Sequence, residues 1–190
     1  NGYVRAEGAV ALVLRRREAA AIGAARRYAE VVAAAVNSDG RTSGVSLPSA
    51  ASQAALLQAL YLRAGVDRDD LAFVEAHGTG TRVGDPAEAE AIGRVLGQKR
   101  SQPLPIGSIK SNIGHLEPAA GLAGVLKAML AFEHGVLPAS LHFKTPNPAI
   151  PFEALNIAVA GRPVALQDAR RPLLAGVSAF IAWPSLPRAS

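Results

Sequence analysis

Two histidines in this 190-residue sequence stand directly after apolar stretches, among glycines and small polar residues. His77 lies in the segment 73–81, FVEAHGTGT, and His115 closes the segment 106–115, IGSIKSNIGH. A neutral imidazole both donates and accepts hydrogen bonds, and neighbouring glycines let a ligand approach the backbone closely. The two segments are therefore the first candidates for a site with chemistry.

The apolar stretches before these histidines, 71–76 and 104–109, are predicted to be buried strands. Ligands of open α/β sheets sit at the carboxyl ends of the strands, where both His77 and His115 would fall. A single histidine after a strand is more often a structural hydrogen-bonding residue. Two of them in matching surroundings favour a shared site at adjoining strand ends.

Other interpretations of the same residues fit less well. The glycine-rich loop 78–84 follows a strand and precedes a helix, but Val83 stands where a dinucleotide fingerprint needs its third glycine. The histidines show no close helical pair with a supporting carboxylate, so no metal is expected. His134, near a predicted helix C-terminus, and His142, in an alternating strand-like stretch, are interpreted as structural.

Composition limits the class of protein. With 49% hydrophobic and 18% charged residues, one globular domain is expected, and the net charge of +5 comes from scattered basic residues, which does not favour nucleic-acid binding. No apolar run approaches the roughly 20 residues that cross a bilayer, so no membrane span and a cytoplasmic location are expected. Cysteine is absent, which excludes a thiol nucleophile within these residues.

The elements that position the two segments alternate along the chain, which indicates an α/β fold with a mixed sheet packed by helices. Ser49 is predicted to cap a helix through Ala64 that Gly65 ends, and the helix 118–134 is apolar nearly all round and expected to be buried. A short helix or loop is expected over 18–29. Further strands are predicted over 2–14, 30–36, 136–143 and 157–159, and a further helix over 85–96.

The segments EAHGTGT (75–81) and KSNIGH (110–115) resemble the two histidine motifs of β-ketoacyl synthases, in the form typical of modular type I polyketide synthases. The resemblance also includes residues 2–9, 36–40, 137–143 and 146–148, and so covers nearly the whole chain to Phe180. It implies the thiolase-like fold, with layers α-β-α-β-α built from two similar halves. Residues 1–36 would end the first half, and residues 37–180 would form the second half around a mixed five-stranded sheet.

The resemblance also implies a reaction. Family members join an acyl group, held on an active-site cysteine, to a malonyl-type unit on the phosphopantetheine arm of an acyl carrier protein, and carbon dioxide leaves. His77 and His115 would donate hydrogen bonds to the thioester oxygen that becomes negative, and Lys110 would help to keep His115 neutral. Lys110 could equally be a structural ion-pair partner.

Further site residues are carried over on the same motifs. Thr79 and Thr81 match the threonines that hold the pantetheine arm, or they stabilise the turn. Asp85, Glu88 and Asn112 match supporting positions, and Asp85 could instead be a helix N-cap before Pro86. No cofactor is expected to bind directly. The expected partners are an acyl carrier protein, the missing N-terminal half and a second copy in a homodimer.

The sequence departs from the family in four places. The family's nucleophilic cysteine is absent, so we expect a piece of a longer protein that is inactive by itself, with exposed apolar faces where the other half would pack. Residues 181–190 contain Pro184 and Pro187 where the family has a glycine-rich loop, and a shifted reading frame would explain this aberrant tail. Asn1 and Ala6 replace the usual Asp and Gly. The rival hypothesis is a non-catalytic half-domain that only binds a carrier arm or a partner.

Overall fold

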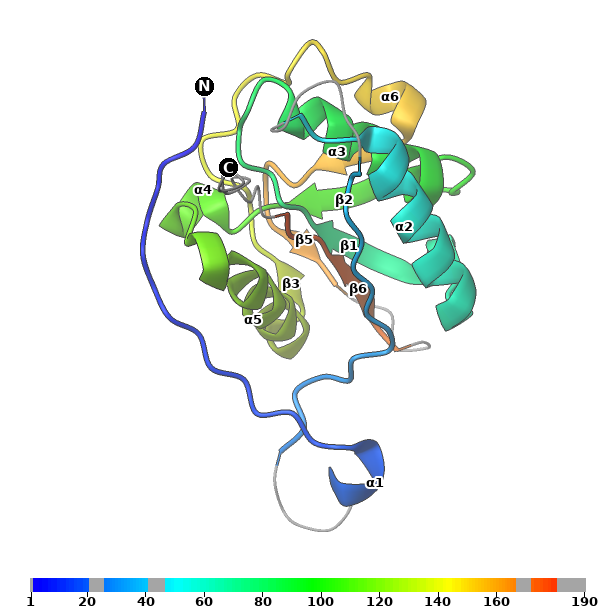
Figure 1. The fold of residues 1–190 in the computed structure, drawn as a ribbon, viewed down its shortest axis with the longest axis vertical. Coiled ribbons are helices and arrows are strands. Elements are labelled where there is room, and N and C mark those ends of the chain that lie inside the picture. Colours follow the sequence, from blue (N-terminus) through cyan, green and yellow to red (C-terminus); the bar gives the residue numbers. More distant parts are fainter. Residues whose placement is uncertain (1, 21–25, 41–46, 167–171, 181–190) are drawn as a thin grey trace, which may run out of the picture.

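The computed structural model describes residues 2–20, 26–40, 47–166 and 172–180, and its centre is a four-stranded parallel sheet with the order β4-β2-β1-β6 (Figure 1). A separate antiparallel pair joins β3 to β5. The strands are β1 Leu71–Glu75, β2 Leu104–Gly107, β3 Val136–Leu137, β4 Ile157–Val159, β5 Val164–Ala165 and β6 Leu174–Val177. The helices are α1 Arg17–Ala20, α2 Ala50–Ala64, α3 Gly84–Ile92, α4 Lys110–Ile113, α5 Ala120–His134 and α6 Phe152–Leu155, with short helical turns at Arg68–Asp70, Gly93–Gly97 and Glu117–Ala119.

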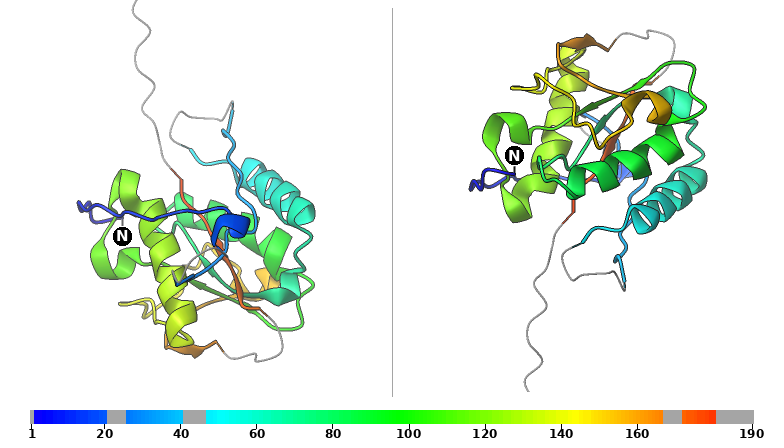
Figure 2. Two further views of the ribbon diagram at one scale, coloured as in Figure 1. Left: turned by 90° about the horizontal axis from the view of Figure 1, so that it is seen from below. Right: turned by 90° about the horizontal axis from the view of Figure 1, so that it is seen from above.

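Helices cover both faces of the parallel sheet (Figure 2). Val74 of β1 packs in a cluster with Ile92 of α3, whereas its neighbour Phe73 packs in a second cluster with Ala128 of α5. Successive side chains of a strand point to opposite faces, so the central strand β1 is buried on both sides. The α/β class expected from the sequence is confirmed.

Local signals fixed the ends of α2 correctly. The Ser49 side chain accepts a hydrogen bond from the backbone N–H of Ser52, and Gly65 ends the helix in the left-handed conformation with φ 63°. Both are the predicted caps, and each satisfies backbone groups that a helix end leaves without partners.

The strands predicted over 2–14 and 30–36 are wrong for the described chain. Both segments are extended but exposed: Val13 is 87% and Val36 is 92% accessible. Within 2–14, the recorded strand-like pairing is a single bridge between Arg5 and His115. A β-strand needs a neighbouring strand for its backbone hydrogen bonds, and in Figure 1 the blue segment runs outside the sheet.

Helix α5 is also less buried than its apolar sequence predicted. Ala123, Ala128 and other small residues face the core, but Leu122 is 43%, Leu126 is 36% and Leu130 is 44% accessible. These leucines recur every four residues and form a stripe on one side of the helix. The helix is therefore buried on one face only.

Two smaller expectations need correction, and two fall on residues that the structure does not describe. The described strands form a parallel sheet of four and a pair, rather than one mixed sheet of five. His142 adopts φ 63° in a turn, not a strand, whereas His134 does lie in the last turn of α5. Residues 21–25 of the predicted short helix and the tail 181–190 lie outside the described residues. Among the helices described, none has the length and apolar character to span a membrane.

Candidate active site

The two predicted histidines meet at the carboxyl edge of the parallel sheet. Strands β1 and β2 are neighbours in parallel register, with Glu75 opposite Gly107, so the loops that follow them leave the sheet side by side. The ring centroids of His77 and His115 are 5.1 Å apart, and the rings are nearly perpendicular at 83°. The sheet therefore brings together two side chains that are 38 positions apart in the sequence (115 − 77).

Backbone hydrogen bonds determine where each imidazole carries its proton. The N–H of Phe180 donates to Nδ1 of His77 at 3.2 Å, and the N–H of Glu117 donates to Nδ1 of His115 at 2.9 Å. A nitrogen that accepts a hydrogen bond bears no proton, so each neutral ring carries its hydrogen on Nε2. Both rings thus have one N–H left to donate.

Electrostatics keep both rings neutral. Burial lowers the pKa of His77 to about 3, and the positive charge of Lys110 and the neighbouring His115 act in the same direction. Burial, followed by Lys110, also lowers the pKa of His115. At neutral pH the pair therefore offers two Nε2–H donors and no positive charge of its own.

Glu88 on α3 holds the first histidine loop. Its two carboxylate oxygens accept hydrogen bonds from the backbone N–H groups of His77 at 2.7 Å and Gly78 at 2.9 Å. The carboxylate is buried, and burial raises its pKa to about 7 although the two N–H donors oppose the shift. Gly78 has φ +45°, and a Cβ there would lie 2.8 Å from the side chain of Ser108 in the second loop. The two loops consequently pack directly on each other.

Asp85 supports the same loop and is not a helix N-cap. Helix α3 begins at Gly84 after Val83, whose side chain makes no capping bond, and Asp85 accepts a hydrogen bond from Gly80 N–H at 3.0 Å. Burial raises the pKa of Asp85. Asp85 therefore contacts the loop of the first histidine, and a supporting role in catalysis stays a prediction.

Thr79 and Thr81 are engaged with each other and with the turn. Their Oγ1 atoms are 3.3 Å apart, and Thr81 Oγ1 accepts a hydrogen bond from Gly84 N–H at 3.2 Å. These contacts are those of a turn-stabilising role. Contact with a pantetheine arm remains a prediction.

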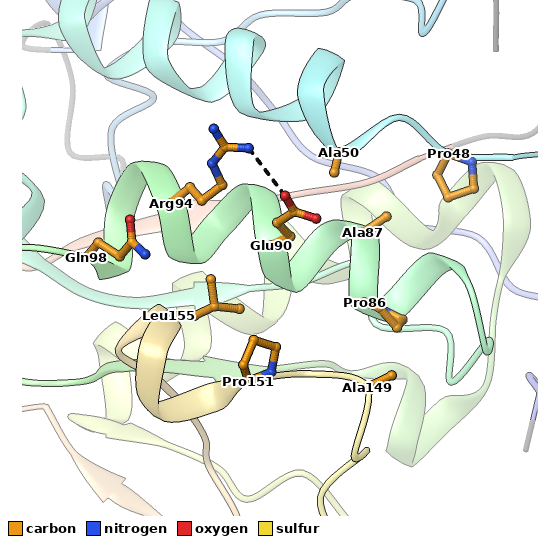
Figure 3. A pocket seen from close by; sticks show the side chains of 10 residues that line it. All are labelled: Pro48, Ala50, Pro86, Ala87, Glu90, Arg94, Gln98, Ala149, Pro151 and Leu155. Atoms are coloured by element: carbon orange, nitrogen blue, oxygen red, sulfur yellow. Dashed lines mark hydrogen bonds and ion pairs between the residues drawn. The ribbon is translucent and has the colours of Figure 1, made fainter. Parts of the chain in front are cut away.

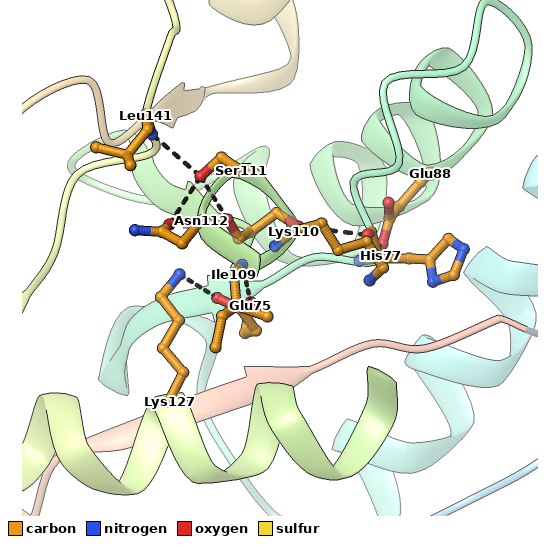
Figure 4. A network of polar contacts seen from close by, with 10 residues as sticks. Glu75, His77, Glu88, Ile109, Lys110, Ser111, Asn112, Lys127 and Leu141 are labelled. Carbon is orange, nitrogen blue, oxygen red and sulfur yellow. Dashed lines mark hydrogen bonds and ion pairs between the residues drawn. The ribbon is translucent and has the colours of Figure 1, made fainter. Parts of the chain in front are cut away.

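Lys110 and Asn112 both lie on α4 but in different surroundings (Figure 4). Burial lowers the pKa of Lys110, and the carboxylates Glu88, Glu75 and Asp85 oppose that shift. Asn112 is exposed, and its Oδ1 accepts a hydrogen bond from the Ser111 hydroxyl. Lys110 thus belongs to the charged surroundings of the histidines, whereas Asn112 lies on the exposed side of α4, and its supporting role stays a prediction.

Residues 3–5, near the amino terminus, form a strap over His115 that the individual sequence motifs did not assign to the site. The N–H of His115 donates to Val4 O at 2.8 Å, and the Tyr3 ring lies edge-on to His115 with centroids 5.2 Å apart. Arg5 makes a two-pronged ion pair with Glu117, next to the backbone N–H that holds His115. No local signal could have found this strap, because its contacts with His115 and Glu117 join residues more than 100 positions apart; the family resemblance of residues 2–9 was the only hint.

Sequence reasoning also missed a buried ion pair beneath the loops. Lys127 of α5 donates to Glu75, the last residue of β1, and the side chains are 7% and 2% accessible. A glutamate inside an otherwise apolar strand was the available signal.

A groove of about 550 Å³ lies elsewhere, between the start of α2, helix α3 and helix α6 (Figure 3). None of the predicted site residues lines it. In the described parts of the chain, no group of three or more His, Cys, Asp or Glu side chains is arranged to hold a metal ion. The lining residues are Pro48, Ala50, Pro86, Ala87, Glu90, Arg94, Gln98, Ala149, Pro151 and Leu155.

Comparison with known proteins gives a consistent result. The family model described as "Beta-ketoacyl synthase, C-terminal domain" matches residues 28–144. One component of the phenolphthiocerol/phthiocerol polyketide synthase of Mycobacterium tuberculosis is 46% identical over 182 residues, 95% of this chain and 10% of that protein. Polyketide synthase GfsA of Streptomyces halstedii is 48% identical over 183 residues, 95% of this chain and 2% of that protein.

Solved structures agree with the sequence relatives. The ketosynthase from module 6 of the bacillaene synthase of Bacillus subtilis 168 superposes with a TM-score of 0.84 and 37% identity, over 88% of this chain and 30% of that one. An oxazolomycin ketosynthase domain of Streptomyces albus superposes with a TM-score of 0.82 and 38% identity, over 88% and 30%. The chain thus spans about a third or less of the length of these relatives.

Proposed function

Because the chain belongs to the β-ketoacyl synthase family, as the C-terminal part of a polyketide-synthase ketosynthase domain, we propose that it serves the decarboxylative condensation of polyketide biosynthesis. In that reaction an acyl thioester is joined to a malonyl-type extender carried on an acyl carrier protein. The observation that supports this proposal most directly is the pair of neutral imidazoles, each with Nδ1 occupied by a backbone N–H and Nε2–H free to donate.

The pair suits the step in which charge develops. When the extender loses carbon dioxide, the electrons of the broken C–C bond pass into an enolate, and the thioester oxygen becomes negative. The Nε2–H groups of His77 and His115 would donate to that oxygen in a preorganised geometry. The enolate carbon then attacks the acyl carbonyl, and the thiolate of the acyl-enzyme leaves.

Lys110 would favour the same step without touching the oxygen. Its positive charge lowers the pKa of both histidines, which keeps them neutral, and it adds a favourable field for the enolate. Under this proposal, Lys110 acts through its electric field on the histidines and the enolate. If Lys110 were instead a structural ion-pair residue, its removal would lower the stability of the protein.

Recognition of the carrier arm is assigned to the loop of the first motif. Thr79 and Thr81 stand next to His77, and their hydroxyls can reorient to hydrogen-bond the amides of a phosphopantetheine arm. The acyl carrier protein would deliver that arm, and no cofactor would bind the chain directly.

The nucleophile must come from residues that this chain does not contain, because the sequence has no cysteine. We propose that an N-terminal ketosynthase half supplies it and packs on apolar surface left open here, including Leu126 and Val13. A homodimer and a cytoplasmic location belong to the same proposal. By itself, the chain would not form an acyl-enzyme; the rival role as a binding half-domain predicts carrier-arm binding without decarboxylation when the other half is present.

The test uses the ketosynthase completed with an N-terminal half. His77→Ala and His115→Ala should each lower the rate of carbon dioxide release from a malonyl carrier protein by about 10²–10³, by analogy with removal of one oxyanion-hole donor. Acylation of the cysteine should change little, and the matched variant His134→Ala, at the exposed end of α5, should keep the native rate. Full decarboxylation in both histidine variants would refute the proposal.

A further inference from the structure

The buried ion pair between Glu75 and Lys127 joins the elements that carry the site (Figure 4). Glu75 ends β1 two residues before His77, and Lys127 lies in the middle of α5, 52 positions further along the chain. Glu75 is 1% and Lys127 7% accessible as whole residues, so neither charge is solvated. The pair is therefore part of the interior, directly beneath the histidine loops.

Glycines make the room for this pair. A Cβ at Gly107, opposite Glu75 in the sheet, would lie 3.1 Å from the Lys127 ammonium. A Cβ at Gly124 of α5 would lie 3.2 Å from Cγ of Glu75. A Cβ at either position would be in tight contact with the ion pair, so the backbone approaches the pair closely on both sides.

The Glu75 carboxylate has a second partner that the ion pair does not explain. One oxygen accepts from Lys127, and the other accepts a hydrogen bond from the backbone N–H of Ile109 at 2.6 Å. Ile109 is the residue from which α4 starts, immediately before Lys110. One buried side chain on β1 thus fixes the turn that leads from β2 to Lys110 and on to His115.

The stability of the fold does not by itself explain the buried ion pair. A buried ion pair gains little over well-packed apolar side chains of similar size, because desolvation of the two charges offsets their attraction. An apolar pair, however, could not accept the Ile109 N–H. The oxygen that faces Ile109 is the feature that only an acidic or amide side chain supplies.

We propose that Glu75 is a positioning residue for the decarboxylation step, which sets Lys110 and His115 through the Ile109 N–H while Lys127 neutralises its charge. The inference rests on the proposed function of the two histidines. It separates two roles: the charge balance of the pair governs stability, and the oxygen acceptor governs the rate.

Two matched double variants of the completed ketosynthase separate these roles. Glu75→Gln with Lys127→Gln removes both charges but keeps an oxygen for Ile109, whereas Glu75→Met with Lys127→Met removes the charges and the acceptor. We expect both to fold, with the methionine pair unfolding at the lower urea concentration because its Ile109 N–H has lost an acceptor. The glutamine pair should release carbon dioxide within about threefold of the native rate, and the methionine pair at least about tenfold more slowly, with the KM for the malonyl carrier little changed, because small misplacements of catalytic groups cost large factors in rate.

A native rate in the methionine pair, or equal losses in both pairs, would overturn the positioning role. That result would leave the proposed function standing as long as His77→Ala and His115→Ala still lower the rate of decarboxylation by about 10²–10³. A second measurement needs no variant that must fold: in the 190-residue chain, the Ile109 amide should exchange hydrogen at least about 100-fold more slowly than that of the exposed Val36. Equal exchange of the two amides, corrected for sequence, would overturn the anchoring contact itself.

Discussion

The histidine edge, residues 76–85 and 107–117, and the open surfaces, residues 9–14, 26–36 and the leucine stripe of α5, are built in opposite ways. At the histidine edge, backbone N–H groups of both loops are paired with buried carboxylates and imidazole nitrogens. On the open surfaces, large apolar side chains such as those of Val13 and Val36 are almost fully accessible.

The two buried side-chain atoms without a partner in the described chain lie outside the histidine edge, on Gln53 and Arg100. The buried side-chain nitrogen and oxygen atoms at the edge thus all have partners among the described residues, whereas apolar side chains of the open surfaces are left accessible. The proposed chemistry and the proposed assembly therefore depend on separate parts of the chain, and substitutions in the two parts should have different effects.

The largest expected effect is on the edge itself. Glu88→Leu removes the acceptors of two buried backbone N–H groups, those of His77 and Gly78, and should lower the free energy of unfolding by about 3 kcal/mol. Urea unfolding measures the change. The matched variant Glu90→Leu, on the exposed side of the same helix, should stay within about 0.5 kcal/mol. If both variants changed the unfolding free energy by the same small amount, the Glu88 carboxylate would not be what stabilises the histidine edge.

Substitutions on the open surfaces should weaken association with a partner and leave the stability of the chain nearly unchanged. Leu126→Lys removes an apolar side chain from the α5 stripe and should change the unfolding free energy of the chain by less than about 0.5 kcal/mol. It should weaken association with an N-terminal ketosynthase half at least about tenfold, because the interface would lose an apolar contact and bury an unpaired charge. Calorimetry measures the affinity. The control is Leu62→Lys on α2, where Leu62 is 82% accessible. An equal loss of affinity in this variant would argue against the leucine stripe as the contact surface.

The smallest effect is a pair of opposite pH dependences within the edge. The pKa of His77 is lowered to about 3 in the folded chain, so its contribution to stability is present above its ordinary pKa of 6.5 and is lost as the pH falls through this range. The pKa of Glu88 is raised to about 7, so its contribution is present below its ordinary pKa of 4.5 and is lost as the pH rises toward 7.

Between pH 4.5 and 6.5 the two contributions therefore have opposite slopes, each at most about 1.4 kcal/mol per pH unit. The two contributions can be separated by measuring the unfolding free energies of the native chain, His77→Gln and Glu88→Gln at pH 4.5, 5.5 and 6.5. Relative to native, His77→Gln should gain stability as the pH falls, and Glu88→Gln should lose it. Parallel curves for all three proteins would contradict the assigned burial of these groups.

Much of the fold followed from local sequence patterns. The caps Ser49 and Gly65, the buried strand 71–76 and the residue types of both histidine segments were all readable from a few neighbouring positions. Such features depend on hydrogen bonds and burial within one turn or one strand, so a short window of sequence contains their causes. The candidate residues His77, His115, Lys110 and Glu88 came from these windows together with the family resemblance.

Other features depended on residues far apart and appeared only in three dimensions. Apolar composition could not tell that residues 2–14 lack strand neighbours, or that α5 leaves its leucines exposed, because pairing and burial are properties of what lies alongside. The proton position of His77 depends on Phe180, 103 residues away, and the anchoring of Ile109 depends on Glu75. The sequence by itself determined which side chains could do the chemistry; the tertiary structure decided their distance, their protonation and their support, because those are set by contacts that close only when the sheet assembles.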